Sequence, residues 1–316
     1  MKHIPLYIIT GFFGAGKTQF LTALLNSSLC RRAGVILNDA GPASIDASLL
    51  PEGPVRASAE LTGAHCFTSG SIDLLVEAFG EFRRKGCDAL FLETSGSAKP
   101  LSLPVLLKKL NAFPEISFRG MICVLDSQQR PLISGIRYIE QQAVYSDLFV
   151  VNGSREMEPS LRKLQPGASV IHTGDPDIIP KLLSMSPDQS RYQEISELRY
   201  LGQEKPKVLF MEPLDPVTSN GLEQFIRFAA PSCMRIKGLI HTREQLSFAV
   251  RTSGSSIEMK EVSRSMTRLP APGLLVIQQP NGTGDRLFPS RWRLLTGGSL
   301  RITSCSEEPQ LKMLYR

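Results

Sequence analysis

The sequence predicts an α/β protein: a doubly wound, mostly parallel sheet followed by a smaller C-terminal α+β domain. Two observations lead to this fold class. In the first half, short apolar runs alternate with stretches of helical spacing, which is the pattern of repeated β-α-β units. The runs are also apolar at consecutive positions, so each strand should be buried on both faces, as in a parallel sheet covered by helices.

The predicted elements of the first half follow in chain order. The apolar runs are rich in β-branched or aromatic residues and are bounded by glycine, proline or polar residues, which is typical of strands. The predicted strands are residues 4–10, 33–38, 89–94, 120–126, 148–152 and 168–173. Residues 17–29 and 72–84 have apolar residues at helical spacing, which predicts two helices. We therefore assign residues 1–183 to a first domain.

The second half has a different pattern. Residues 184–206 are polar and contain two prolines, and we interpret them as a linker. Beyond them, residues 220–230 have helical spacing and lie among strand-like segments. These predicted strands are residues 207–214, 234–242, 246–254 and 274–280. One helix against an antiparallel sheet predicts an α+β domain over residues 207–316.

The composition excludes several classes of protein. Hydrophobic residues make up 42% and charged residues 21% of the 316 residues, which are values of a globular protein. No apolar run approaches the roughly 20 residues that a membrane helix needs. Lys17 interrupts the apolar N-terminal stretch, which argues against a signal peptide. The six cysteines are widely scattered, so we expect a reduced, cytoplasmic protein without a membrane partner.

The formal net charge of +6 is concentrated in the second half. Residues 1–183 carry 18 Lys+Arg and 17 Asp+Glu, a net charge of +1, whereas residues 184–316 carry 18 and 13, a net charge of +5. No zinc finger, RNA-binding aromatic motif or dense basic run accompanies this excess. We interpret it as a mildly basic surface and expect no nucleic-acid partner.

One motif assigns a ligand to the first domain. Residues 11–18 match the pattern G-x-x-x-x-G-K-[ST] at every fixed position, between a predicted strand and a predicted helix. Its glycines let backbone N–H groups point at phosphate oxygens, its lysine reaches the β and γ phosphates, and its threonine hydroxyl ligates Mg²⁺. The sequence therefore predicts a phosphate-binding loop of the P-loop NTPase type. Its residues are Gly11, Gly14, Ala15, Gly16, Lys17 and Thr18.

A second segment, residues 92–96, ends the strand predicted at 89–94. Ligands bind at the carboxyl ends of the strands in a sheet of this kind, so Glu93 and Gly96 should face the phosphates. Glu93 would hold a magnesium-bound water, and the Gly96 N–H would reach the γ phosphate. The alternative is a helix-capping Ser/Thr turn.

The chain also resembles the CobW-like P-loop GTPases, relatives of the UreG and HypB nickel-insertion GTPases. TGFFGAGKT corresponds to the family's phosphate loop, VILNDAGPASID to its switch segment, AELTGAHCFT to ELTNGCICCT and LETSGSAKP to ETSGLADP. VLDS, VVNGSRE, LQPGASVI and MRIKGLI continue the matches in the same order. The resemblance implies a Mg²⁺-dependent GTPase in which Lys17, Asp39 and Glu93 support hydrolysis and Asp39 joins Thr18 and Glu93 near the magnesium.

The family's base-reading motif, NKxD, is altered in this chain. It has become Asn152-Gly153-Ser154-Arg155, and an arginine has only donors, so it cannot accept hydrogen bonds from guanine as the aspartate does. We expect Asn152 to contact the base and Glu156, one residue further on, to supply the acceptor. GTP is the expected nucleotide, and ATP stays open.

The family's metal-binding CxCC motif is reduced to Ala64-His65-Cys66-Phe67, and Pro42 replaces the second acid of the switch segment. Tight zinc or cobalt binding needs three or four ligands. One hypothesis is a transition-metal site made of Cys66 and Asp39 with help from His65. The other is a vestigial or repurposed loop, which the ligand count favours.

The resemblance implies a GTPase switch that loads or protects a metal or corrinoid cofactor on a client protein, and that forms a homodimer across the nucleotide. A second hypothesis is a non-hydrolysing nucleotide-binding module with relaxed base specificity, which the altered NKxD and CxCC motifs favour. A small-molecule kinase is a third. Such a kinase needs an acceptor site and a lid, and here the second domain follows the first instead of interrupting it.

Overall fold

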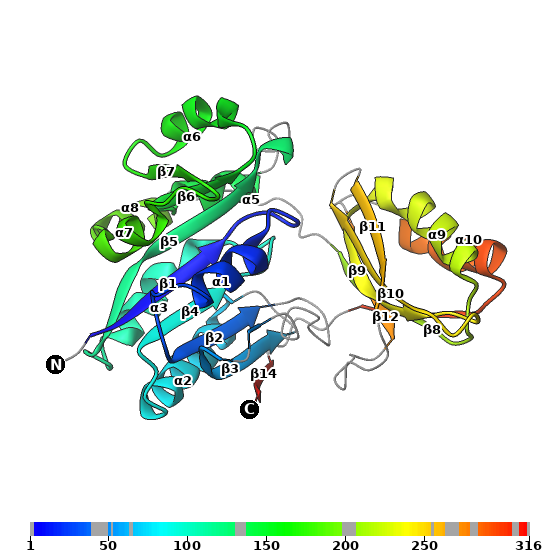
Figure 1. Cartoon of the computed structure of the whole chain (residues 1–316), viewed down its shortest axis with the longest axis horizontal. Helices are drawn as coiled ribbons and strands as arrows, with labels where there is room; N and C mark the ends of the chain where they lie inside the picture. Colours follow the sequence, from blue (N-terminus) through cyan, green and yellow to red (C-terminus); the bar gives the residue numbers. More distant parts are fainter. Residues whose placement is uncertain are drawn as a thin grey trace. The chain divides into compact units, whose positions relative to one another are not determined.

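The computed structural model describes residues 3–38, 50–51, 53–62, 66–129, 137–197, 207–253, 256–262, 272–278, 284–304 and 310–314. They form two compact units, shown in Figure 1. The first unit holds the described residues up to Asn38, those from Leu50 to Glu197, and the strand Gln310–Leu314. The second unit holds the described residues from Lys207 to Ser304.

A sheet forms the centre of the first unit. Its described strands are β1 (Ile4–Thr10), β2 (Ala33–Asn38), β3 (Val55–Thr62), β4 (Ala89–Glu93), β5 (Ile116–Asp126), β6 (Leu148–Asn152), β7 (Ser169–His172) and β14 (Gln310–Leu314). Their order across the sheet is β14-β3-β2-β4-β1-β5-β6-β7. All of these pairs are parallel except β14 with β3. The predicted doubly wound parallel sheet is therefore confirmed.

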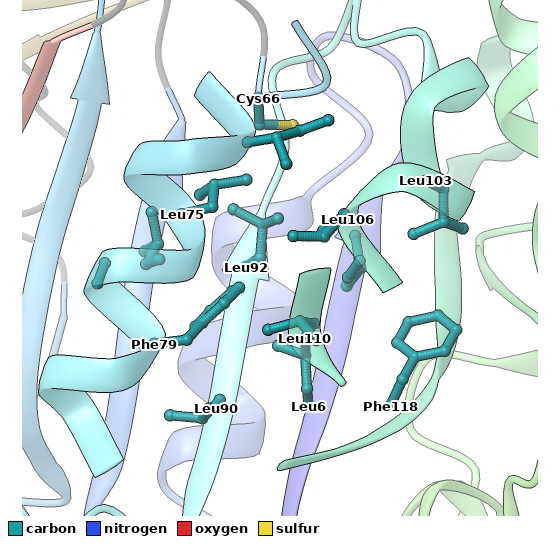
Figure 2. Packing of buried hydrophobic residues seen from close by; sticks show 14 of the residues in the cluster. Leu6, Cys66, Leu75, Phe79, Leu90, Leu92, Leu103, Leu106, Leu110 and Phe118 are labelled. Atoms are coloured by element: carbon teal, nitrogen blue, oxygen red, sulfur yellow. The ribbon is translucent and has the colours of Figure 1, made fainter. Parts of the chain in front are cut away.

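Helices cover both faces of this sheet (Figure 1). Those described are α1 (Lys17–Leu25), α2 (Ser69–Arg84), α3 (Leu103–Leu110), α5 (Arg137–Val144), α6 (Glu158–Leu164), α7 (Ile178–Ser184) and α8 (Ser190–Glu197). On one face, apolar side chains of α2 and α3, among them Phe79 and Leu106, pack with Leu92 of β4 (Figure 2). On the other face, Tyr7 of β1 stacks on Phe91 of β4 with ring centroids 5.6 Å apart. This burial on both faces explains the consecutive apolar residues of the strands.

The second unit is an antiparallel sheet packed against helices. Its described strands are β8 (Val208–Pro213), β9 (Cys233–His241), β10 (Ser247–Ser253), β11 (Ser256–Glu261), β12 (Gly273–Gln278) and β13 (Leu300–Ser304), in the order β11-β10-β9-β12-β8-β13. Helices α9 (Ser219–Ala229) and α10 (Gly284–Thr296) pack together through Phe225 and Trp292, whose ring centroids lie 4.8 Å apart. The predicted α+β class is confirmed. One helix was predicted in this unit; α10, which contains Pro289 in its interior, was not.

The segment 184–206, interpreted above as a linker, contains helix α8. Arg191 and Tyr192 of α8 each donate a hydrogen bond of 2.6 Å to the carboxylate of Asp147, which also accepts the backbone N–H of Met121 at 2.7 Å. Burial raises the pKa of Asp147, and the hydrogen bond from Tyr192 opposes that rise. These bonds hold α8 on the first unit, which therefore continues beyond residue 183.

Strand β14 also lies in the first unit, although the sequence analysis placed residues 207–316 in the second domain. It pairs antiparallel with β3, with Lys312 opposite Glu60 and Met313 opposite Ala59. β3 itself was not predicted, because Arg56, Ser58 and Glu60 interrupt any apolar run. Two strands with weak sequence signals thus complete one edge of the sheet. Tertiary contacts, and not local sequence pattern, determine their pairing.

None of the described helices is long and apolar enough to cross a membrane.

Candidate nucleotide-binding site

The loop between β1 and α1 curls through three glycines. Gly11, Gly14 and Gly16 have φ angles of 138°, 76° and 93°, which residues with a side chain rarely adopt. A Cβ on Gly11 would lie 2.1 Å from the carbonyl oxygen of Val124 in β5, so glycine is required there for a second reason. The loop then enters α1 at Lys17, with Gly16 as the N-cap residue. This is the backbone geometry that the motif predicts.

Lys17 lies across the loop that precedes it. Its Nζ donates hydrogen bonds to the carbonyl oxygens of Gly11 at 2.9 Å and Phe12 at 3.1 Å. The side chain is buried, as are the rings of Phe12 and Phe13, which meet edge to face at 5.3 Å. An ammonium group so placed is fixed at the mouth of the curled backbone, where phosphate oxygens bind in loops of this type.

Thr18 and Glu93 meet at the ends of neighbouring elements. The Thr18 hydroxyl donates a hydrogen bond of 2.8 Å to Oε1 of Glu93. Glu93 is buried and is the last residue of β4, opposite Ile9 of β1 and Leu37 of β2. The parallel register therefore brings this carboxylate to the first turn of α1. A hydroxyl and a carboxylate side by side are the oxygen ligands that Mg²⁺ prefers.

The loop after β4 is packed tightly against the phosphate-binding loop. A Cβ on Gly96 would lie 2.7 Å from the backbone nitrogen of Phe13, so only glycine allows this approach. The buried amide of Gln142 in α5 donates to the carbonyl oxygens of Gly96 at 3.1 Å and Ala98 at 2.9 Å. Gln142 was not singled out in the sequence, where nothing distinguishes it from any glutamine of an amphipathic helix.

Asn38 joins three backbone segments with one side chain. Its Oδ1 accepts the N–H groups of Cys66 at 3.0 Å and of Ser95 at 3.3 Å, and its Nδ2 donates to the carbonyl oxygen of Leu61 at 3.1 Å. Asn38 is the last residue of β2 and is buried. Asn38 was not among the predicted site residues, although it lies inside the segment that corresponds to the family's switch. It connects the loop that follows β3 with the loop that carries Gly96.

Cys66 faces the apolar core. The side chain is fully buried, and it belongs to the cluster of α2, α3 and β4 that includes Leu75 and Leu92 (Figure 2). Burial strongly raises the pKa of its thiol, which keeps it protonated. A metal binds the thiolate form of cysteine, so a metal at Cys66 would have to displace the proton of a buried thiol. No group of three or more His, Cys, Asp or Glu side chains suited to a metal occurs among the described residues.

The altered base-reading motif forms an ordered turn after β6. Gly153 has φ 98°, and a Cβ there would lie 2.2 Å from the Ser127 hydroxyl. That hydroxyl accepts the Ser154 N–H at 3.0 Å, and the Ser154 hydroxyl in turn accepts the Glu156 N–H at 3.3 Å. Asn152 and Glu156 are both exposed. The motif thus lies at the carboxyl end of β6, at the same edge of the sheet as the phosphate-binding loop.

Arg155 is held by an acid on the next helix. Its guanidinium lies 3.6 Å from Glu158, whose carboxylate also contacts Arg162 at 3.6 Å and bonds to Nε2 of His172 at 2.8 Å. The hydrogen bond with His172 lowers the pKa of Glu158. Arg155 therefore has a partner in the first turn of α6, and the acceptor function of the usual aspartate is not restored at this position.

Two sequence-predicted residues, Asp39 and His65, lie outside the described residues. The others, apart from Cys66 in the apolar core, divide into two sets. The phosphate-loop residues, Glu93 and Gly96 come together, whereas Asn152 and Glu156 lie on a separate turn. Their roles in binding stay predictions.

The fold and the loop geometry define a P-loop nucleotide-binding domain. A family model described as the CobW/HypB/UreG nucleotide-binding domain matches residues 5–172. The chain belongs to this family.

Known proteins of the family are similar over part of the chain. The zinc chaperone CobW of Pseudomonas aeruginosa is 32% identical over 140 residues, which are 40% of this chain and 36% of that protein. The zinc-regulated GTPase metalloprotein activator 1 of Dictyostelium discoideum is 34% identical over 115 residues, 32% of this chain and 24% of that protein. The matched region thus spans well under half the length of these curated relatives.

Solved structures give more distant matches. The Zn(II)-bound YjiA GTPase from Escherichia coli is 16% identical with a TM-score of 0.41, over 93% of this chain and 99% of that one. HypB from Helicobacter pylori in complex with nickel is 15% identical with a TM-score of 0.40, over 65% and 92%.

We predict that Asn38→Ala lowers the free energy of unfolding by about 1–3 kcal/mol, because two buried N–H groups lose their acceptor. Urea denaturation measures the change. Asn152→Ala is the matched control, since it removes an exposed asparagine from the end of a strand of the same sheet and should change stability by less than about 0.5 kcal/mol. Equal effects of the two substitutions would contradict the connecting role of Asn38.

We predict that Cys66→Ser leaves metal stoichiometry unchanged, because the thiol packs in the apolar core. Equilibrium dialysis against Zn²⁺ or Co²⁺ with a competing chelator measures it. Cys123→Ser, at another fully buried thiol, controls for loss of folding. Tight stoichiometric metal in the parent that disappears only in Cys66→Ser would restore the metal-site hypothesis.

Proposed function

We propose that this chain is a Mg²⁺-dependent GTPase that acts as a nucleotide-driven switch or chaperone for a client protein with a metal or corrinoid cofactor. The observation that carries the proposal is the phosphate-binding loop with Lys17 at its mouth and the Thr18–Glu93 pair beside it. Family membership, and the zinc chaperone and metalloprotein activator among the similar proteins, support the client class.

The phosphates would bind in the curl from Gly11 to Gly16, with backbone N–H groups as donors. The Lys17 ammonium would donate to β and γ phosphate oxygens instead of its two carbonyl partners. Hydrogen bonds to these charged acceptors are stronger than those to neutral carbonyl oxygens. The Thr18 hydroxyl and the Glu93 carboxylate would hold Mg²⁺, with Asp39 as the third oxygen donor expected from the sequence. The ion, when bound, neutralises charge on the phosphates.

The switch itself would use the loop after β4. Gly96 lies against Phe13 of the phosphate-binding loop, so its N–H is near the place where a γ phosphate would sit. Movement of this loop would reach Cys66 through Asn38, whose Oδ1 bonds to both segments. Hydrolysis would thereby change the backbone on which the family carries its metal motif. In this chain the buried thiol favours a client contact over a metal handover at that loop.

A second candidate is a nucleotide-binding module with relaxed base specificity that does not hydrolyse. The ion pair of Arg155 with Glu158 favours it, because the position that normally reads guanine is occupied by a cation. A cytoplasmic location and a homodimer across the nucleotide belong to the proposal only through family resemblance. Measurement of phosphate release separates the two candidates.

Lys17→Ala tests the proposal directly. We expect nucleotide affinity to fall at least about tenfold, or hydrolysis to be lost, because the charge at the β and γ phosphates is removed. Isothermal titration with GTP and a phosphate-release assay measure the two quantities. Lys181→Ala, at an exposed lysine of α7, should behave as the parent. Wild-type binding and turnover in Lys17→Ala would contradict the site assignment.

The base preference gives a separate prediction. We expect GTP to bind better than ATP by a smaller factor than an intact NKxD motif gives, since one lost bidentate acceptor is worth roughly 1–3 kcal/mol. Glu156→Ala should abolish the remaining preference, whereas Glu77→Ala, at an exposed acid of α2, should keep it. Competition binding with GTP and ATP measures the ratio. An unchanged ratio in Glu156→Ala removes Glu156 from the base site, and a strong ATP preference in the parent contradicts the GTPase proposal.

A further inference from the structure

The helical layer of the second unit exposes large apolar side chains beside arginines. Leu287 and Leu294 of α10 are 51% and 69% exposed, and Phe228 of α9 is 37% exposed. Phe288 and Trp292, on the inner side of α10, fill the core of the unit and are fully buried. Helix α10 is therefore well packed against its unit, and its exposed apolar residues lie on the side away from the core. We name this surface the α9–α10 patch. It consists of Phe228, Arg286, Leu287, Arg291, Arg293 and Leu294.

The patch is continuous across the two helices. Leu287 and Leu294 are seven residues apart, as are Arg286 and Arg293, so each pair lies on one side of α10 two turns apart. The guanidinium of Arg291 lies 5.3 Å from the ring centroid of Phe228 and joins α10 to α9. Figure 1 shows these helices together on one side of the second sheet. The apolar groups thus alternate with cations over one surface.

The charge of the patch is not compensated within the described residues. Arg286 and Arg293 have neither an ion pair nor a hydrogen bond there. The acid of α9, Glu223, is exposed and already forms an ion pair of 2.7 Å with Arg227 of the same helix. Helix α10 has three arginines and one acid, Asp285, in its sequence, so it carries a net positive charge. Part of the net charge of +5 in residues 184–316 is therefore gathered at this surface, and carboxylates on a partner would complement it.

The residue types favour a protein partner over a lipid surface. Arginine and aromatic residues such as phenylalanine are enriched at protein–protein contacts, where lysine is depleted, and the patch has three arginines, one phenylalanine and no lysine. A helix that lies in a membrane interface buries a broad apolar face in lipid. Here that face of α10 is used for the core, and the exposed side mixes leucine with arginine.

We propose that the α9–α10 patch is a docking surface for an acidic protein segment that carries apolar side chains, such as a helix with alternating glutamate and leucine positions. Leu287, Leu294 and Phe228 supply the apolar contact, and Arg286 and Arg293 pair with carboxylates around it. The surface lies in the second unit, so the inference does not rest on nucleotide binding and goes beyond the proposed function.

The experiment uses the full chain and a fluorescent synthetic helical peptide of glutamate and leucine heptads, with binding read by anisotropy at low and high salt. The test variants are R286E/R293E and Leu294→Ala. Their matched controls are K108E/K181E and Leu183→Ala, which change exposed lysines of α3 and α7 and an exposed leucine of α7. Circular dichroism and GTP binding confirm that every variant is folded. Phosphatidylserine vesicles and sedimentation of the chain alone test a lipid and a second copy as occupants.

We expect the parent to bind the peptide and to lose affinity at high salt. R286E/R293E should weaken binding at least about tenfold and Leu294→Ala about threefold, with the controls unchanged. A parent that does not bind the peptide, or a patch variant that binds it as the parent does, would overturn the proposal. It is also overturned if vesicle binding or self-association, rather than peptide binding, responds to R286E/R293E.

Discussion

The parallel pairing of β1, β2 and β4 brings the functional loops of the first unit to one edge of its sheet. β1 leads into the phosphate-binding loop, β2 ends at Asn38, and β4 ends at Glu93. The carboxyl ends of parallel strands lie at the same edge of a sheet. Residues that are distant in sequence therefore become neighbours there. The Thr18–Glu93 contact and the three bonds of Asn38 both depend on this register.

Close backbone packing is the second condition at that edge. Gly11 lies against the carbonyl of Val124, and Gly96 lies against the backbone of Phe13, so neither position has room for a Cβ. The surrounding loops are then held by buried polar side chains, Gln142 among them. Leaving a buried amide without its hydrogen-bond partners costs free energy, so Gln142 and Asn38 fix the loops that they join relative to one another.

The two altered family motifs have different structural outcomes. At the base-reading turn, the backbone is kept by Ser127 and Ser154, while Arg155 forms an ion pair with Glu158. At the loop that corresponds to the family's CxCC motif, Cys66 packs in the apolar core and its backbone N–H donates to Asn38. Both loops thus keep defined hydrogen bonds although their side chains differ from the family motifs. The second unit offers a different chemistry, in which arginines and exposed apolar groups share one helical surface.

The strands that are apolar on both faces, the phosphate-binding loop and the two-part organisation could be predicted from the sequence, because local pattern and spacing encode them directly. The sequence also placed Glu93 at the end of β4 and Gly96 in the loop that follows, because the apolar run that predicts this strand ends there. It did not reveal β3, α10 or the return of β14 to the first sheet, whose short or interrupted patterns gain stability only from their neighbours. The burial of Cys66 and the bonds of Asn38 were likewise decided by tertiary structure, because a side chain's solvent access and partners depend on which loops the sheet brings together.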